Sequence, residues 1–204
     1  MHLATLMRGN RMGRWGNSIA ALAAGAVLAT AVTSLLVTMV ASIADLVWIL
    51  KMRNASPELQ SVLGFNFERS LGRWPQELLL GLTFGSLWAI LSGFLGALIF
   101  LAVGFSLLSS HHHEHRTYVW TGALVGLAHS VVGLSLSLAD QLVGPTSRWE
   151  DVIQSLAGWG GFFLTSSPRL EVVVATFPAS VVAGAMAGLL YGHVVDRDHP
   201  SATA

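Results

Sequence analysis

Long apolar stretches separated by short polar segments dominate the pattern of the chain. The stretch 19–50 carries a single charge, Asp45, near its far end, and three further stretches carry none. A helix of roughly 20 apolar residues crosses a hydrocarbon core about 30 Å thick. Backbone groups in lipid must bond within their own segment, which favours helices. The pattern therefore predicts an all-α integral membrane protein with four transmembrane helices, over about 19–50, 78–108, 117–139 and 172–195.

The second half of the chain repeats the first. Similar residues recur about 94 positions apart, among them Asp45 with Asp140, Gln60 with Gln154, Pro75 with Pro168, and Thr83 with Thr176. The repeat predicts two tandem hairpins, 1–108 and 117–204, joined by a histidine-rich turn at 109–116. Two units of two helices each keep the same orientation in the membrane. We therefore expect a pseudo-twofold axis along the membrane normal.

The long loop inside each hairpin is predicted to hold a short interfacial helix. In the first loop, Ser56 before Pro57 suits a helix start. In the second, Ser147 and Glu150 have the spacing of a capping box. A re-entrant half-helix is the alternative, although charges in the first loop disfavour deep entry. The two repeated prolines, Pro75 and Pro168, are predicted to begin the transmembrane helices that follow.

Composition and charge agree with a membrane protein. The chain is 53% hydrophobic and 11% charged, lacks cysteine, and has no formal net charge, which gives no argument for nucleic acid as a partner. Arginines precede the first apolar stretch, and Ala29-Thr30-Ala31 mimics a signal-peptide cleavage site. Because that stretch continues to Leu50, we expect a retained helix. The arginine cluster predicts cytoplasmic termini, as in a multi-pass protein of the bacterial inner membrane.

Histidines supply two candidate sites. The turn residues His111, His113 and His115 are candidate ligands for Zn²⁺, Ni²⁺ or Cu²⁺, whereas a plain polar turn is the alternative. His129 lies in the middle of the third span, where an ionisable group is a functional candidate. Glycines beside it leave room for a pigment such as haem or chlorophyll, and a neutral histidine bonded to Ser or Thr is the other interpretation. His193 lies about 15 Å away in depth, which disfavours a bis-histidine haem.

Four further residues are candidates for a pathway or a partner contact. Asp45 and Asp140 end the first helix of each half, where two carboxylates attract a cation or simply mark the solvated boundary. Thr83 and Thr176 occupy matching positions in the second and fourth spans. The spans hold no deep Asp, Glu, Lys or Arg, which argues against a proton relay.

These patterns predict function only in outline. Nucleophile–base pairs and phosphate-binding loops are absent from the sequence, so we do not expect an enzyme. We expect an accessory or scaffold subunit, packed in a larger membrane complex against lipid and against other membrane subunits or itself. A small transporter or channel with a pathway between the repeats is the alternative, and a pigment-binding subunit using His129 is the third. Cofactors stay unassigned.

Overall fold

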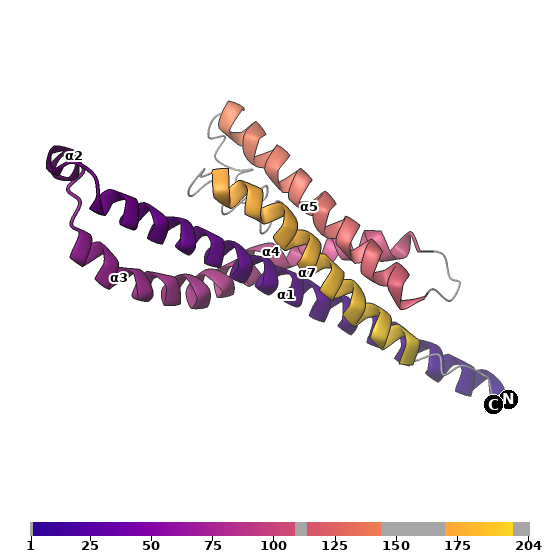
Figure 1. Cartoon of the computed structure of the whole chain (residues 1–204). Coiled ribbons are helices and arrows are strands. Elements are labelled where there is room, and N and C mark those ends of the chain that lie inside the picture. The colour runs from indigo at the N-terminus through magenta and orange to yellow at the C-terminus, as the bar shows by residue number, and fades with distance from the viewer. Residues whose placement is uncertain (1, 109–113, 144–169, 198–204) are drawn as a thin grey trace.

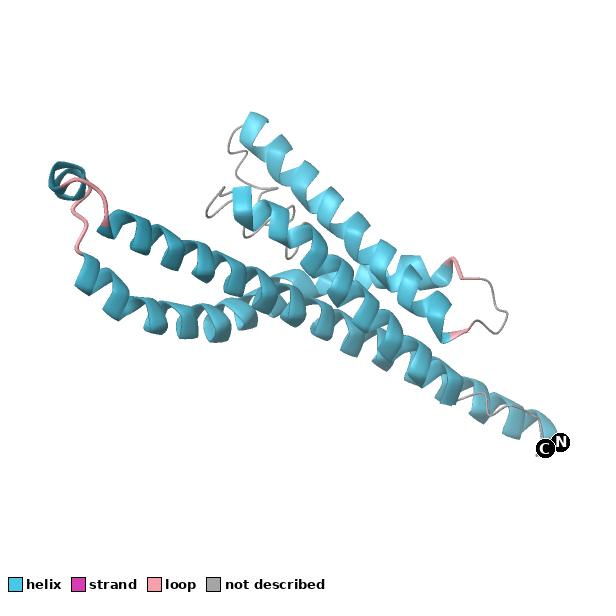
Figure 2. Ribbon diagram, viewed as in Figure 1, coloured by secondary structure: helices cyan, strands magenta, loops and turns pink. Residues whose placement is uncertain are grey.

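The computed structural model describes residues 2–108, 114–143 and 170–197, with side chains over 16–108, 114–135 and 173–195. These residues are helical apart from short connections (Figures 1 and 2). The elements are α1 (His2–Arg53), α2 (Pro57–Val62), α3 (Phe67–Leu80), the π-helix η1 (Gly81–Gly85), α4 (Ser86–Ser106), α5 (His115–Val143) and α7 (Leu170–Arg197). Within the described ranges, four helices are long and apolar enough to cross a membrane: α1, the continuous α3–η1–α4, α5 and α7.

The four long helices pack in a ring. α1 contacts α7, α7 contacts α5, α5 contacts α4, and α4 contacts α1. The interface between α5 and α7 is the most extensive of the four, and the one between α4 and α5 is the smallest. Figure 1 shows α5 and α7 side by side, with α1 continuing past them toward α2. The bundle therefore has one tightly joined side and one looser side.

Glycines bring α5 and α7 into backbone contact. At three places, a Cβ atom added to a glycine would collide with a carbonyl oxygen of the other helix: Gly122 with Gly184, Gly126 with Ser180, and Gly188 with Tyr118. These pairs run in opposite directions along the two helices, which makes the packing antiparallel. Small residues permit such close approach where lipid offers no hydrophobic contrast between helices. The register of α5 on α7 is therefore specified by glycine positions.

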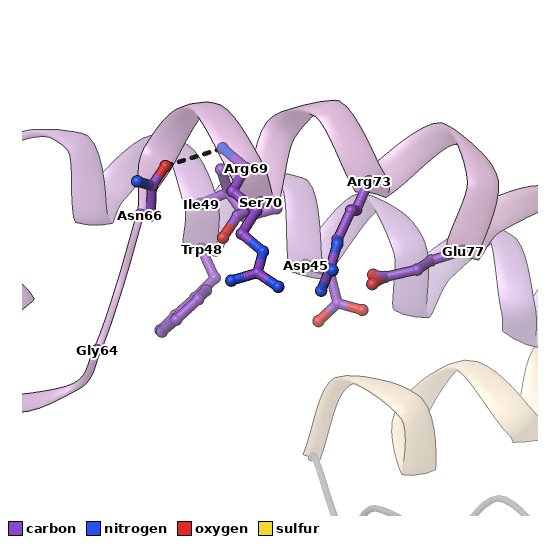
Figure 3. A pocket seen from close by; sticks show the side chains of 9 residues that line it. All are labelled: Asp45, Trp48, Ile49, Gly64, Asn66, Arg69, Ser70, Arg73 and Glu77. Carbon is purple, nitrogen blue, oxygen red and sulfur yellow. Dashed lines mark hydrogen bonds between the residues drawn. The ribbon is translucent and has the colours of Figure 1, made fainter.

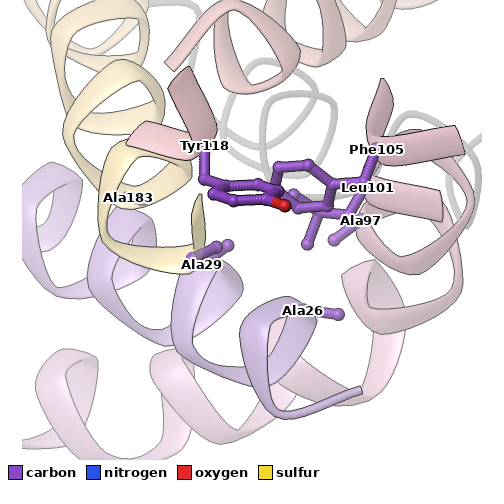
Figure 4. Close-up of a cluster of buried hydrophobic side chains, with 8 residues drawn as sticks. Ala26, Ala29, Ala97, Leu101, Phe105, Tyr118 and Ala183 are labelled. Carbon is purple, nitrogen blue, oxygen red and sulfur yellow. The ribbon is translucent and has the colours of Figure 1, made fainter. Parts of the chain in front are cut away.

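Alanines and aromatic rings fill the core on the side of the bundle where α1 begins (Figure 4). The stacked rings of Phe105 and Tyr191 have centroids 4.4 Å apart and are nearly parallel, and Tyr118 meets Phe105 edge-on at 6.3 Å. The buried members of this cluster are Ala26, Ala29, Ala97, Leu101, Phe105, Tyr118, Ala183 and Ala187. Short side chains let α1, α4 and α7 approach closely, and the rings close the end of the core.

The hairpin between α1 and α3 is held by local hydrogen bonds. The Ser56 hydroxyl accepts a bond from the backbone N–H of Leu59 and caps α2, as the sequence predicts. The Gln60 amide donates to the Met52 carbonyl at 2.9 Å and thereby satisfies a carbonyl at the end of α1. Gly64 follows α2 with φ of 60°, a conformation that favours glycine. The turn is therefore specified by its own sequence.

The prediction that Pro75 begins a helix is wrong. Pro75 lies inside α3, and the helix begins eight residues earlier at Phe67, where the Asn66 side chain accepts a hydrogen bond from the N–H of Arg69 at 2.9 Å. A proline inside a helix removes one backbone hydrogen bond, at a cost of about 3 kcal/mol. The N-cap and continuous packing on α1 offset this cost, so the helix continues past Pro75. The charged segment before Leu78, predicted as part of the loop, is therefore helical from Phe67 onward.

Other predictions of architecture stay predictions. The positions of the helices do not test the pseudo-twofold repeat or the interfacial placement of α2. The second loop helix predicted after Ser147, and Pro168, lie outside the described residues.

Candidate functional site

Polar side chains gather inside the bundle, near the middle of α1 and α5 and in the first half of α7. We call seven of them the polar layer, and each is at most 5% exposed: Thr30, Thr33 and Ser34 of α1, His129 and Ser130 of α5, and Thr176 and Ser180 of α7. Among the residues whose side chains are described, none of the buried ones is Asp, Glu, Lys or Arg. The interior is therefore polar without fixed charge.

The α1–α7 contact places two parts of the polar layer together. A Cβ atom on Gly25 would lie 3.5 Å from the Cβ of Ala187. In antiparallel helices, two turns further along α1 correspond to two turns back along α7. This register brings Thr33 opposite Ala179, immediately before Ser180. The hydroxyls of α1 and α7 therefore lie at one level.

The α5–α7 contact adds the remaining members. Because Gly126 packs on the carbonyl of Ser180, the next turn of each helix brings Ser130 opposite Thr176. Both side chains are buried. The polar layer thus contains residues from three of the four spanning helices.

Hydrogen bonds within the polar layer are partly local. The Thr30 hydroxyl donates to the Ala26 carbonyl at 2.9 Å, and the Ser180 hydroxyl donates to that of Thr176 at 2.8 Å. The hydroxyls of Thr33, Ser34 and Ser130 make no hydrogen bond to any described residue. Leaving a buried hydroxyl unsatisfied costs about 1–3 kcal/mol. These three groups are therefore the most available for a polar ligand.

His129 contributes an aromatic contact to the polar layer. Its ring is 2% exposed and stacks on Phe100 of α4, with centroids 4.6 Å apart and planes 24° from parallel. The space beside Gly126 is occupied by the α7 backbone, so this glycine serves helix packing and leaves no gap for a flat macrocycle. Cofactor binding at His129 stays a prediction.

The paired threonines occupy different environments. Thr176 is buried in the polar layer, whereas Thr83 is exposed in η1 and its hydroxyl donates to the Leu79 carbonyl at 2.7 Å. The structure does not bring them together. Asp45 is half-buried beside a pocket between α1 and α3. Asp140 belongs to α5, and its side chain lies outside the described part of the chain.

The candidate metal ligands are only partly described. His111 and His113 lie outside the described residues, and His115 is the first residue of α5. Its ring lies 6.4 Å, centroid to centroid, from that of His193 near the end of α7, with the planes 77° apart. Among the described residues, no group of three or more His, Cys, Asp or Glu side chains is placed to hold a metal ion, so metal binding at these histidines stays a prediction. The sequence could not reveal this pairing, because antiparallel packing of two distant helices creates it.

The fold defines a class of protein. Four apolar helices indicate a multi-pass membrane protein. No protein family matches this chain, and no curated protein or solved structure matches it either. The assignment of a function therefore rests on the chain's own residues.

Proposed function

We propose that this protein is a non-enzymatic accessory subunit of a membrane complex, and that it binds its partner through the arm. The arm comprises residues 45–77: the end of α1, the whole of α2 and most of α3. Figure 1 shows this hairpin extending beyond α5 and α7, with α2 at its tip. The single observation that carries the proposal is the exposed apolar surface of α2 and of the adjoining ends of α1 and α3.

The surface of the arm has the composition of a protein contact. Large apolar side chains are exposed all along it, and Val62 in α2 is 83% exposed. Outside the apolar stretches 19–50 and 78–108, the others are Leu59, Leu63 and Leu71, while Val47, Trp48 and Leu50 are exposed at the end of the first stretch. Exposed apolar groups that lie close together mark interaction sites. The arm also carries eight charges, four of each sign. Mixed charge suits a protein partner better than a polyanion.

The bundle supports the same proposal by its rigidity. Direct backbone contact between α5 and α7 leaves no space for side-chain rearrangement at that interface. Packed interiors deform little, so the bundle is suited to hold the arm in a fixed position. None of the buried side chains that the structure describes is Asp, Glu, Lys or Arg, so nothing among them points to a proton relay. These features fit a scaffold.

Site-directed cross-linking tests the proposal. The chain has no cysteine, so Val62→Cys introduces a unique thiol at the tip of the arm. A photoactivatable maleimide on that thiol is expected to cross-link to another polypeptide in native membranes. The matched control is Leu91→Cys, which is 69% exposed on α4 and faces lipid. Absence of an adduct at Val62, with equal labelling of both thiols, would refute docking through the arm.

A small transporter or channel is the second candidate, and the polar layer favours it. Unbonded hydroxyls at mid-span offer groups to a neutral polar solute. The purified chain, reconstituted alone into liposomes, should then accelerate solute flux, and Ser130→Ala should reduce it. Flux through the chain alone would overturn the accessory role.

We further propose that the two halves arose by duplication and that both termini face the cytoplasm of a bacterial inner membrane. The ring order α1, α4, α5, α7 is the order that a twofold axis between two hairpins would produce. The cytoplasmic termini rest on the arginine cluster before the first span. Labelling of single cysteines from either side of the membrane tests this orientation.

A further inference from the structure

A pocket of about 510 Å³ lies in the arm between α1 and α3 (Figure 3). Ligand sites commonly enclose roughly 300–1,000 Å³. Its lining is unusually rich in charge and includes Asp45, Trp48, Asn66, Arg69, Arg73 and Glu77. Figure 3 shows the guanidinium groups of Arg69 and Arg73 turned into the pocket, on the side where the Asp45 carboxylate also lies. The pocket therefore presents two guanidinium groups and two carboxylates, those of Asp45 and Glu77, to a ligand.

The pocket lies near the ends of the apolar stretches of both helices. Asp45 is the single charge inside the apolar stretch of α1 and lies five residues before its end at Leu50, and Glu77 is the last charge before the apolar stretch that begins at Leu78. The indole N–H of Trp74 donates to the Ser42 carbonyl at 2.8 Å, which aligns the two helices at this level. The edge of the hydrocarbon core is therefore expected close to Asp45 and Glu77.

With the core edge at Glu77, Arg73 is expected at the depth of lipid phosphates, and the Arg69 side chain reaches back toward that level from one turn further out. Arg73 is one helical turn beyond Glu77, a distance of about 6 Å. A bilayer about 40–45 Å thick with a core of about 30 Å has a polar layer roughly 5–7 Å thick on each side. Arg69 lies one turn further out, and its side chain turns toward the same pocket. Guanidinium groups bind phosphate in a bidentate manner.

The charge balance argues against a ligand with more than one phosphate. The carboxylates of Asp45 and Glu77 offset the two arginines, so a second phosphate would meet negative groups. Trp48 lines the same pocket, and tryptophan is enriched at the level of lipid headgroups. We propose that this pocket binds the phosphodiester of one membrane phospholipid, with Arg69 and Arg73 as its ligands. From the sequence alone, the charges of Arg69 and Arg73 indicate only that the loop does not insert deeply into the membrane.

Native mass spectrometry of the full chain tests this assignment. The purified protein in detergent is titrated with phosphatidylglycerol, with a glycosyl diacylglycerol of the same acyl chains, and with soluble glycerophosphate. One phosphatidylglycerol is expected to bind, and the phosphate-free glycolipid is expected to bind at least tenfold more weakly, because a charge-assisted hydrogen bond contributes enough for about a tenfold change in affinity. Equal binding of the two lipids would overturn the proposal. Equally tight binding of glycerophosphate would assign the site to a soluble ligand instead.

Variants connect the binding to the pocket. Arg69→Gln with Arg73→Gln is expected to weaken phosphatidylglycerol binding more than tenfold, whereas Arg116→Gln, an exposed arginine at the start of α5, should leave it unchanged. Replacing Arg73 also alters the surroundings of Asp45, so Arg69→Gln alone provides a second measurement, with an expected loss of about tenfold. Wild-type affinity in Arg69→Gln would contradict the role of this side chain.

Discussion

Replacing Gly126 by alanine tests the closest helix contact in the molecule. The added methyl group would collide with the carbonyl oxygen of Ser180 and would lie 3.4 Å from the Cα of Gly184. The first obstacle is backbone, which cannot rotate away as a side chain can. The helices α5 and α7 must therefore separate, and this separation also weakens the neighbouring contact of Gly122 with Gly184.

The magnitude follows from two opposing effects. Extra atoms in a well-packed interior cost typically 1–3 kcal/mol, and contact with backbone places Gly126→Ala near the upper end. Alanine recovers about 1 kcal/mol of helix propensity over glycine. We therefore expect the free energy of unfolding to fall by about 2 kcal/mol. Gly72→Ala is the matched control, because nothing lies within 4 Å of its added Cβ. This control should stabilise α3 by about 0.5–1 kcal/mol.

The assay is reversible unfolding in mixed micelles, in which SDS is titrated and helix content is followed by circular dichroism. The two variants carry the same chemical change and are expected to shift the midpoint in opposite directions. If Gly126→Ala were as stable as Gly72→Ala, the backbone contact between α5 and α7 would not exist in solution, and the rigidity attributed to the bundle would lose its basis.

Three further predictions concern the arm and the core. Trp74→Phe removes the indole bond to the Ser42 carbonyl and is expected to cost about 1 kcal/mol, with faster amide exchange in the arm; unchanged exchange would contradict this. Gly64→Ala places a side chain at φ of 60° and should lower the free energy of unfolding by about 1–2 kcal/mol, measured by thermal unfolding. An unchanged stability would contradict the left-handed conformation of Gly64. Phe105→Ala, in the ring cluster, should cost about 3 kcal/mol in the same SDS titration, and the exposed Phe84→Ala much less; equal losses would argue against that core.

The spanning helices could be predicted because lipid imposes a simple rule on them. Apolar length alone places four spans. The rule fails at a boundary where a helix continues into a charged segment, as it does through Pro75, since charged residues are compatible with a helix even where the apolar stretch has ended. Asn66 was the available signal, because a residue of this type preceding an amphipathic stretch is a common N-cap.

The candidate site could be predicted only residue by residue. Mid-span position was enough to single out His129, but its stacking on Phe100 depends on how α5 is rotated against α4. Neighbours across helices are set by side-chain packing, which periodicity within one helix does not encode. The separation of Thr83 from the polar layer has the same origin, because equal positions in a repeat need not have equal surroundings.

The mass of the complex extracted from native membranes tests the proposed role most directly. A tagged chain, solubilised in mild detergent and analysed by native mass spectrometry, is expected to carry at least one different polypeptide. The variant Val62→Asp, at the tip of the arm, should release that polypeptide while the four-helix bundle stays folded. Recovery of the wild-type chain only as a monomer or a homo-oligomer would contradict the account.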